Sequence, residues 1–321
     1  MTIQTAPGGA GRSVDLVVET GELVVGLGID AGSTTCKAVA VDARGRIVAW
    51  SLAPMSPRVE DQTRLTLDAF RAACHTQGAS VFATGYGRKL VGGADRAITE
   101  ITCHARGVFA DTGHAGTLID VGGQDSKVIR IGATGAAVDF AMNDKCAAGT
   151  GRFLEHTAAR LDVALDDLGP TALSAPDAAR ITSTCTVFAE SEIISLVAHG
   201  EPVDRILLGL HAGLVSRILA MARGVGLVPP LLLSGGVARN SAVVALVAEQ
   251  AGLEVHLPSR PQLMGAYGAA LLAANHETAP HRETVAGPGR RERATSGETP
   301  RCEECPPAER RSVLGGVFRR R

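Results

Sequence analysis

The sequence predicts an α/β chain built from two similar lobes around a central cleft. Two observations predict this fold class: apolar, β-branched strand-length segments alternate with helix-length segments, and one glycine-containing hairpin pattern occurs twice. The chain has 321 residues, 45% of them hydrophobic, which is enough for two domains of ordinary size. We expect the lobes to cover residues 22–115 and 116–276.

Strands are predicted for the short apolar segments at 24–30, 37–42, 46–52, 80–84, 117–121, 127–131 and 231–234. Helices are predicted for the longer segments at 59–74, 152–161, 187–199, 201–223 and 241–250. The helix over 201–223 has the clearest pattern, because its apolar residues follow 3.6-residue spacing. These residues are Ile206, Leu207, Leu210, Leu214 and Ile218.

The two ends of the chain differ from its middle. Residues 1–21 are polar and glycine-rich without clear periodicity, so we expect a loose leader there. From 277 to 321 the composition changes to Pro, Arg, Glu, Thr and Gly. Such a stretch cannot bury enough apolar area to offset its ordering entropy, so we expect a disordered tail.

The charge and composition argue against some classes of partner. The formal net charge is −1 and aromatic residues make up 3%, so neither nucleic acid nor an anionic membrane is expected as a partner. No run approaches the roughly 18 apolar residues that span a bilayer, and residues 1–20 lack the pattern of a secretion signal. A cytoplasmic location is therefore expected, in which the chain's seven cysteines stay reduced.

The repeated hairpin pattern is an Asp-x-Gly signature followed by lysine. Asp30 and Asp120 are each followed by glycine after two residues and by lysine after seven, and apolar runs flank both copies. This pattern predicts a strand, a tight turn and a strand. Glycine lets backbone N–H groups approach an anion, and an aspartate at a strand end can hold a hydrated cation. Two such hairpins facing each other would clamp a metal-bound polyphosphate.

A third glycine site follows the strand predicted at 231–234, where Gly235 and Gly236 precede a helix. A Gly-Gly turn after a strand is a weak signal on its own. Two phosphate hairpins followed by a late strand and Gly-Gly is, however, the order seen in the actin, Hsp70 and sugar-kinase superfamily, and the chain resembles it. The resemblance implies two actin/Hsp70-like (ribonuclease H-like) lobes around a nucleotide cleft.

Three further segments narrow this resemblance: Thr84-Gly85-Tyr86-Gly87-Arg88, Met142-Asn143-Asp144-Lys145-Cys146-Ala147-Ala148-Gly149-Thr150-Gly151-Arg152-Phe153-Leu154-Glu155, and Ser183-Thr184-Cys185-Thr186-Val187-Phe188-Ala189-Glu190-Ser191-Glu192. With them the chain resembles the BadF/BadG/BcrA/BcrD-type ATPase family over residues 24–274. That family comprises the activators of 2-hydroxyacyl-CoA dehydratases and the ATPase subunits of benzoyl-CoA reductases.

The resemblance implies ATP and Mg²⁺ in the cleft, with positioning and charge neutralisation supplying most of the catalysis. Asp30 and Asp120 would face the hydrated metal, and Gln124 or Asp125 would orient the attacking water. Lys37 would reach a terminal phosphate oxygen. The phosphates would be wrapped by Gly32, Ser33, Thr34, Gly122 and Gly123, and the adenosine would lie against Gly235 and Gly236. The alternative for each hydroxyl is an ordinary turn or cap.

The resemblance also implies one [4Fe–4S] cluster shared between two subunits, with Cys146 and Cys185 as the ligands of each. A cubane takes about four thiolates, and an isologous two-fold axis turns two into four. Both cysteines precede predicted helix N-termini, whose amides stabilise negative charge. Two alternatives remain: both cysteines are ordinary buried thiols, or Cys302 and Cys305 form a separate metal or redox pair.

The function implied is an ATP-hydrolysing electron donor to a partner enzyme that acts on a CoA thioester. The partner is either a dehydratase or a reductase component, the subunits form a homodimer or a heterodimer, and ferredoxin or flavodoxin would supply electrons. No residue of the sequence separates these choices. Two rivals use the same hairpins: a small-molecule or sugar kinase, which needs a catalytic aspartate aimed at a hydroxyl, and an actin-like protein whose ATP cycle controls assembly.

Overall fold

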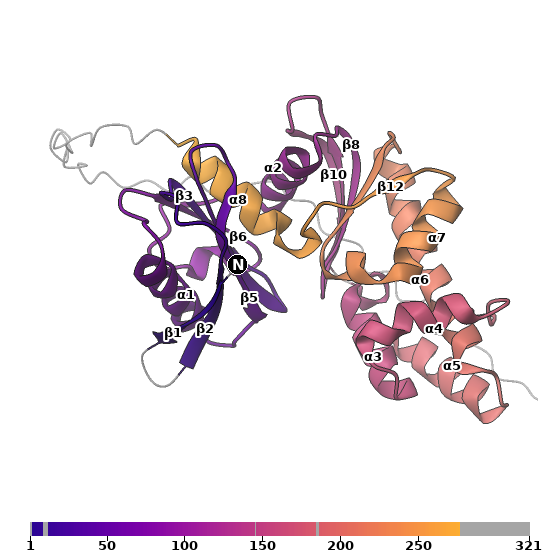
Figure 1. Cartoon of the computed structure of the whole chain (residues 1–321). Coiled ribbons are helices and arrows are strands. Elements are labelled where there is room, and N and C mark those ends of the chain that lie inside the picture. The colour runs from indigo at the N-terminus through magenta and orange to yellow at the C-terminus, as the bar shows by residue number, and fades with distance from the viewer. Residues whose placement is uncertain (1, 9–11, 145, 184–185, 277–321) are drawn as a thin grey trace, which may run out of the picture. The chain divides into compact units, whose positions relative to one another are not determined.

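The computed structural model describes residues 2–8, 12–144, 146–183 and 186–276 (Figure 1). The chain divides into two units, Met1–Thr278 and Ala279–Arg321, and the described residues belong to the first. They form two sheets with helices packed against them. The tail predicted over 277–321, with Cys302 and Cys305, lies outside the described residues.

The first sheet has seven strands in the order β1-β2-β5-β4-β3-β6-β7. Strand β4 pairs antiparallel with β3 and β5, whereas β6 pairs parallel with β3 and β7. The strands are β1 (Thr2–Gly8), β2 (Arg12–Val18), β3 (Gly26–Ala31), β4 (Thr35–Val41), β5 (Ile47–Pro54), β6 (Ser80–Thr84) and β7 (Arg96–Ala97).

The second sheet has five strands in the order β10-β9-β8-β11-β12. They are β8 (Gly116–Val121), β9 (Ser126–Ile131), β10 (Ala137–Asn143), β11 (Leu231–Ser234) and β12 (Val255–His256). Strand β9 pairs antiparallel with β8 and β10, and β11 pairs parallel with β8 and β12. The order β5-β4-β3-β6-β7 in the first sheet has the same strand directions, so the prediction of two similar α/β lobes is confirmed.

The helices include every one predicted from the sequence, with ends that differ by at most two residues. They are α1 (Val59–Ala73), α2 (Glu100–Thr112), α3 (Gly151–Leu161), α4 (Leu168–Ser174), α5 (Thr186–Ala198), α6 (Val203–Val225), α7 (Ser241–Ala251) and α8 (Met264–Ala274). The apolar residues that predicted α6 are all buried in the core of the second lobe. Helix α6 begins after Pro202. Proline is tolerated at this position because the first N–H groups of a helix have no partner within the helix.

The segment expected to be a loose leader, residues 1–21, instead contains strands β1 and β2. Strand β2 pairs with β5 through Val17 and Val18, and Leu16 is fully buried in the core of the first lobe. The sequence did not predict this pairing, because the composition of residues 1–21 is polar. Strand β2 is stabilised by contacts with β5, which lies about 30 residues further along the chain, and not by its local propensity.

Helix α8 connects the C-terminal part of the chain to the first sheet. It packs against β3, β4 and β6 and against α2 (Figure 1). One core cluster contains Val39 of β4, Leu118 of β8 and Ala270 of α8, so both sheets contribute to it. The last helix of the predicted second lobe, 116–276, therefore packs against the first sheet.

Among the described residues, one helix is long and apolar enough to cross a membrane by length and composition, namely α6. More than half of its apolar window is buried inside the protein, at 56%. That burial is typical of the core helix of a globular lobe.

Candidate functional site

The two Asp-x-Gly segments form hairpins of the same geometry. In the first, Asp30 pairs with Lys37, and Gly32 N donates to Thr35 O at 3.1 Å. In the second, Asp120 pairs with Lys127, and Gly122 N donates to Asp125 O at 2.9 Å. The same register and turn hydrogen bond recur, so the sequence repeat is also a structural repeat.

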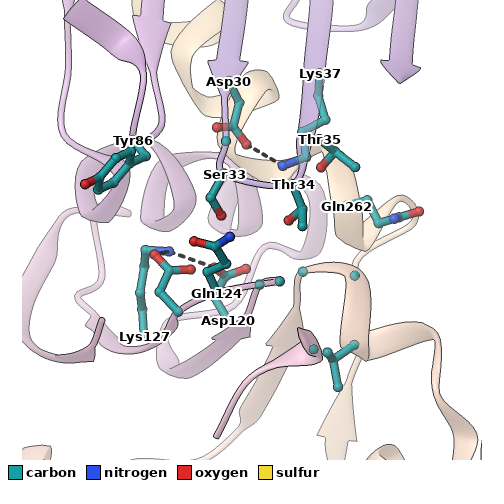
Figure 2. A pocket seen from close by; sticks show the side chains of 18 of the residues that line it. Asp30, Ser33, Thr34, Thr35, Lys37, Tyr86, Asp120, Gln124, Lys127 and Gln262 are labelled. Atoms are coloured by element: carbon teal, nitrogen blue, oxygen red, sulfur yellow. Dashed lines mark hydrogen bonds and ion pairs between the residues drawn. The ribbon is translucent and has the colours of Figure 1, made fainter. Parts of the chain in front are cut away.

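The two hairpins face each other across a cavity of about 490 Å³ (Figure 2). Ser33 and Thr34 of the first hairpin point towards Gln124 of the second. A Cβ added at Gly123 would lie 2.9 Å from Thr34 Cβ, and closer to its hydroxyl, so only glycine lets the hairpins approach this closely. The cavity is lined by every nucleotide-site residue predicted from the sequence: Asp30, Gly32, Ser33, Thr34, Lys37, Asp120, Gly122, Gly123, Gln124, Asp125, Gly235 and Gly236.

The Gly-Gly turn closes one end of the cavity. Gly235 has φ +88° and an added Cβ would overlap the backbone of Val121, so this position requires glycine for close packing. Gly236 is different, because the nearest atom to an added Cβ is Gln262 Nε2 at 3.7 Å. An added Cβ at Gly236 would therefore overlap no atom of the protein, and the adenosine assignment of this side of the cavity stays a prediction.

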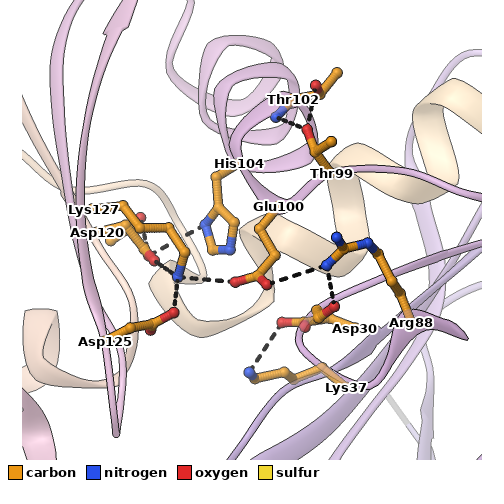
Figure 3. A network of polar contacts seen from close by, with 12 residues as sticks. Asp30, Lys37, Arg88, Thr99, Glu100, Thr102, His104, Asp120, Asp125 and Lys127 are labelled. Atoms are coloured by element: carbon orange, nitrogen blue, oxygen red, sulfur yellow. Dashed lines mark hydrogen bonds and ion pairs between the residues drawn. The ribbon is translucent and has the colours of Figure 1, made fainter. Parts of the chain in front are cut away.

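Lys127 lies at the centre of a buried group of charges (Figure 3). Its Nζ lies 2.8 Å from Asp125 Oδ2, 3.0 Å from Glu100 Oε2 and 3.6 Å from Asp120 Oδ2. Burial alone lowers the pKa of Lys127, but the three facing carboxylates outweigh it and raise the pKa above the ordinary lysine value. Lys127 is thus a fixed cation that holds three carboxylates together.

Asp120 is 2% exposed and lies at the end of β8. Ser234 Oγ donates to Asp120 Oδ1 at 2.7 Å, and His104 Nδ1 lies 3.2 Å from the same oxygen. Burial raises the pKa of Asp120, but His104, Lys127 and Ser234 outweigh it and hold the pKa far below the usual range. Burial likewise lowers the pKa of His104, but Asp120 reverses the shift and leaves it raised. Asp120 is therefore an anion at neutral pH.

Lys37 occupies the position equivalent to Lys127 but has a simpler environment. Its Nζ donates to Asp30 Oδ2 at 3.0 Å, and its side chain is 15% exposed against 3% for Lys127. Asp30 itself is 4% exposed. Of the two repeated lysines, Lys37 is the one free to exchange its carboxylate partner for a phosphate oxygen.

Sequence reasoning missed several residues that line the cavity, including Thr35, Tyr86, Glu100, His104, Arg239, Asn240 and Gln262. Glu100 and His104 come from α2, which the sequence did not predict as a helix. Tyr86 lies in the sequence motif from Thr84 to Arg88, which was singled out without a role for Tyr86. Lys127, which also lines the cavity, is the lysine of the second Asp-x-Gly pattern. The sequence therefore carried a signal for these two residues. Gln262 lies in the segment before α8 and carries no sequence signal.

Cys146 lies outside the cavity and is exposed. Asn143 at the end of β10 holds its backbone, since Asn143 Nδ2 donates to Cys146 O at 2.9 Å and Cys146 N donates to Asn143 Oδ1 at 3.2 Å. The residues that follow reach the second hairpin, where Gly151 N donates to Gly122 O at 2.8 Å and Arg152 N donates to Gly123 O at 2.7 Å. Cys185 lies outside the described residues, directly before α5.

The fold and the site together define a nucleotide-binding protein of the actin-like α/β fold. The two sheets share one strand arrangement, their Asp-x-Gly hairpins face each other, and a Gly-Gly turn closes the cavity between them. Comparisons with known proteins make the class specific. The chain belongs to the BadF/BadG/BcrA/BcrD ATPase family, which matches residues 27–273. It is an ATP-binding ATPase, as predicted from the hairpins and the cysteine-bearing motifs.

Three similar proteins illustrate the family. The chain is 42% identical over 249 residues to the activator of lactoyl-CoA dehydratase from Anaerotignum propionicum, covering 77% of this chain and 96% of that one. It is 28% identical over 271 residues to a benzoyl-CoA reductase subunit from Thauera aromatica, covering 79% and 95%. The solved activator of the 2-hydroxyisocaproyl-CoA dehydratase from Clostridium difficile, with bound ADPNP, has a TM-score of 0.73 and 37% identity, covering 78% and 94%.

Proposed function

We propose that this ATPase drives a low-potential electron from a [4Fe–4S] cluster, shared between two subunits, into a partner enzyme that acts on a CoA thioester. The observation that carries the proposal is the pair of backbone hydrogen bonds from Gly151 and Arg152 to the carbonyls of Gly122 and Gly123. They join the second phosphate hairpin to the segment that carries Cys146. A change at the phosphates would therefore reach Cys146, a cluster ligand under this proposal, through five residues of chain.

The cavity fits Mg²⁺ bound to a polyphosphate. Asp30 and Asp120 place carboxylates on facing hairpins, and Ser33 and Thr34 add hydroxyls. Mg²⁺ prefers such hard oxygen ligands and would neutralise phosphate charge when bound. Lys37 would bind a terminal phosphate oxygen.

Gln124 is the better candidate to orient the attacking water. Asp125 is already engaged, since its Oδ2 accepts from Lys127 Nζ at 2.8 Å. Gln124 makes no side-chain hydrogen bond within the described part of the chain and faces Ser33 across the cavity. An amide that is free to turn can both accept from a water and donate to a phosphate oxygen.

Cys146 and Cys185 of each subunit would hold the cluster, which supplies a one-electron carrier. The exposed position of Cys146 suits a ligand at a subunit interface. Higher identity to a dehydratase activator than to a reductase subunit favours a 2-hydroxyacyl-CoA dehydratase as the partner. The family resemblance then implies that the subunits form a homodimer. We further propose a cytoplasmic location, where thiols stay reduced, and a ferredoxin or flavodoxin as electron donor.

The test is iron and acid-labile sulfide analysis of the anaerobically purified protein, together with its visible spectrum. We expect about four irons per dimer, lost in Cys146→Ser and in Cys185→Ser while ADPNP binding is retained. Cys74→Ser serves as the control, because it removes a thiol far from both motifs in sequence. Wild-type protein that contains no iron but hydrolyses ATP at full rate would contradict the proposal and favour a kinase or an assembly ATPase.

A further inference from the structure

Arg217 bridges two segments that are distant in sequence. It lies on α6, and its partly buried guanidinium donates from Nη1 to Ala148 O at 2.9 Å and from Nη2 to Ser183 O at 3.1 Å. Ala148 lies two residues after Cys146, and Ser183 two residues before Cys185. One side chain therefore holds both cysteine-bearing segments of the same subunit.

The helix that carries Arg217 is a firm base for this bridge. Its neighbours Leu214 and Ile218 on α6 are fully or almost fully buried in the core of the second lobe. A guanidinium is planar and presents its donors in a fixed fork, so two simultaneous bonds define both the distance and the angle between the two carbonyls. The separation of the two carbonyls is thus set by the planar guanidinium of Arg217, which is carried by a helix packed in the core.

A carboxylate holds the second segment from the other side. Glu192 on α5 accepts from Thr182 N at 2.8 Å and from Ser183 N at 2.8 Å. Burial would raise the pKa of Glu192, but these donors outweigh it and lower the pKa to about 2. Ser183 is therefore fixed at its N–H by an anion and at its carbonyl by a cation.

We propose that Arg217 is a positioning residue for the iron–sulfur cluster: it sets the separation of the Cys146 and Cys185 segments and binds, with a positive charge, carbonyls two residues from each cysteine. This inference rests on the proposed function. Hydrogen bonds, nearby charge and the partners of a cluster's ligands tune its stability and potential. A cation beside a cluster that gains negative charge on reduction favours the reduced form, so removal of Arg217 makes the potential more negative.

The experiment compares anaerobically purified wild type, Arg217→Gln, Arg217→Lys and Arg223→Gln. Arg223 is the matched control, because it lies on the same helix and is exposed, and because its side chain forms no hydrogen bond or ion pair among the described residues. For each protein we would measure iron content, the rate of cluster loss to a chelator, the electron paramagnetic resonance spectrum of the reduced cluster, its reduction potential and ADPNP affinity.

For Arg217→Gln we expect faster cluster loss to a chelator, by about 10-fold, the lower end of the effect on metal affinity when a group that supports metal ligands is removed. We also expect a changed resonance spectrum and a more negative potential, with ADPNP affinity unchanged. Arg217→Lys should rescue the potential more than the spectrum, because an ammonium keeps the charge but loses the two-pronged bridge. Arg223→Gln should match wild type.

An Arg217→Gln protein that keeps its cluster, spectrum and potential would overturn the inference and leave the proposed function intact. A wild-type protein without iron would instead overturn the proposed function. Hydrogen exchange gives a readout that does not need the cluster: in Arg217→Gln, the amides near Ala148 and Ser183 should exchange faster than in wild type. Equal exchange in iron-free samples of both proteins would show that the bridge does not hold the two segments.

Discussion

At the scale of single residues, the nucleotide site depends on the balance of charge around Lys127. Asp120, Glu100 and Asp125 all face its ammonium group, and its side chain is 3% exposed. Removal of one partner from a buried ionic group leaves the others without compensation, and this loss costs far more than the intact group contributes. Lys37, with one carboxylate partner and greater exposure, is less dependent on its pair.

We therefore predict that Lys127→Met destabilises the protein by about 3–5 kcal/mol, measured by urea unfolding at pH 7. Lys37→Met is the matched control and should cost clearly less, because its single partner, Asp30, reaches the open cavity. Equal losses in the two variants would show that the three carboxylates do not depend on Lys127.

The loss of unfolding free energy caused by Lys127→Met should also depend on pH. In wild type, Lys127 helps to depress the pKa of Asp120, so the stabilisation from this carboxylate is present above its unfolded pKa of about 3.9 and is lost as pH falls towards the lower folded pKa. In the variant the buried carboxylates take up protons more readily. The difference in unfolding free energy between the two proteins should therefore shrink as the pH is lowered from about 5 towards the folded pKa of Asp120.

At the scale of elements, glycine allows α8 to lie close to its neighbours. A Cβ added at Gly268 of α8 would lie 2.6 Å from the carbonyl carbon of Cys103 in α2, and closer to its oxygen. On β3, a Cβ at Gly28 would overlap the backbone of Ala266 in α8. These contacts are backbone to backbone, so no side chain can move aside to make room. Helix α8 is thus held against both α2 and the first phosphate hairpin's strand.

Gly268→Ala should accordingly destabilise the protein by about 1–3 kcal/mol, as overpacking does in a close-packed core. Gly213→Ala in α6 is the control, because no atom lies within 4 Å of the added Cβ. There we expect stabilisation of about 0.5–1 kcal/mol, the usual helical preference for alanine. Thermal and urea unfolding would measure both, and a stabilised Gly268→Ala protein would show that α8 is not tightly packed.

Helix α8 also shows why part of the fold was not predictable. Its residues are buried on nearly every side, so the apolar pattern has no 3.6-residue period, and its glycines and alanines give no strong propensity. The hairpins of Asp30 and Asp120 were predictable because strand, turn and strand are encoded within a few consecutive residues. Strand β10 and helix α2 had weaker local patterns and were missed.

The residues of the candidate site also fall into those that local sequence predicts and those that it does not. The residues on the hairpins and the Gly-Gly turn were found because each motif is continuous in sequence. Glu100, His104 and Gln262 were missed because they reach the cavity from elements that carry no motif. Arg217 could not have been found, since the carbonyls that it binds lie 69 and 34 residues away. Only the packing of α6 brings these three points together.

At the scale of the whole molecule, the cavity makes nucleotide binding a property of both lobes together. One hairpin comes from each sheet, and a shared core containing Val39 and Leu118 connects the sheets. A ligand that contacts both hairpins therefore binds only when both lobes are folded and correctly placed. Its binding energy should stabilise the two lobes as one cooperative unit.

We predict that Mg²⁺ with ADPNP at 100 times its Kd stabilises the protein by about 2.7 kcal/mol, which corresponds to a rise of about 5 °C in Tm for a folded chain of this size. AMP at about 100 times its own Kd would give the same stabilisation free energy, because that energy depends only on the ratio of ligand concentration to Kd. The informative comparison is therefore between ADPNP and AMP at equal concentration. There ADPNP should raise Tm far more than AMP, because its terminal phosphates reach the hairpins. In Gly123→Val, whose side chain would collide with Thr34, that advantage should disappear. If ADPNP and AMP gave equal shifts in wild type, the facing hairpins would not be the phosphate site.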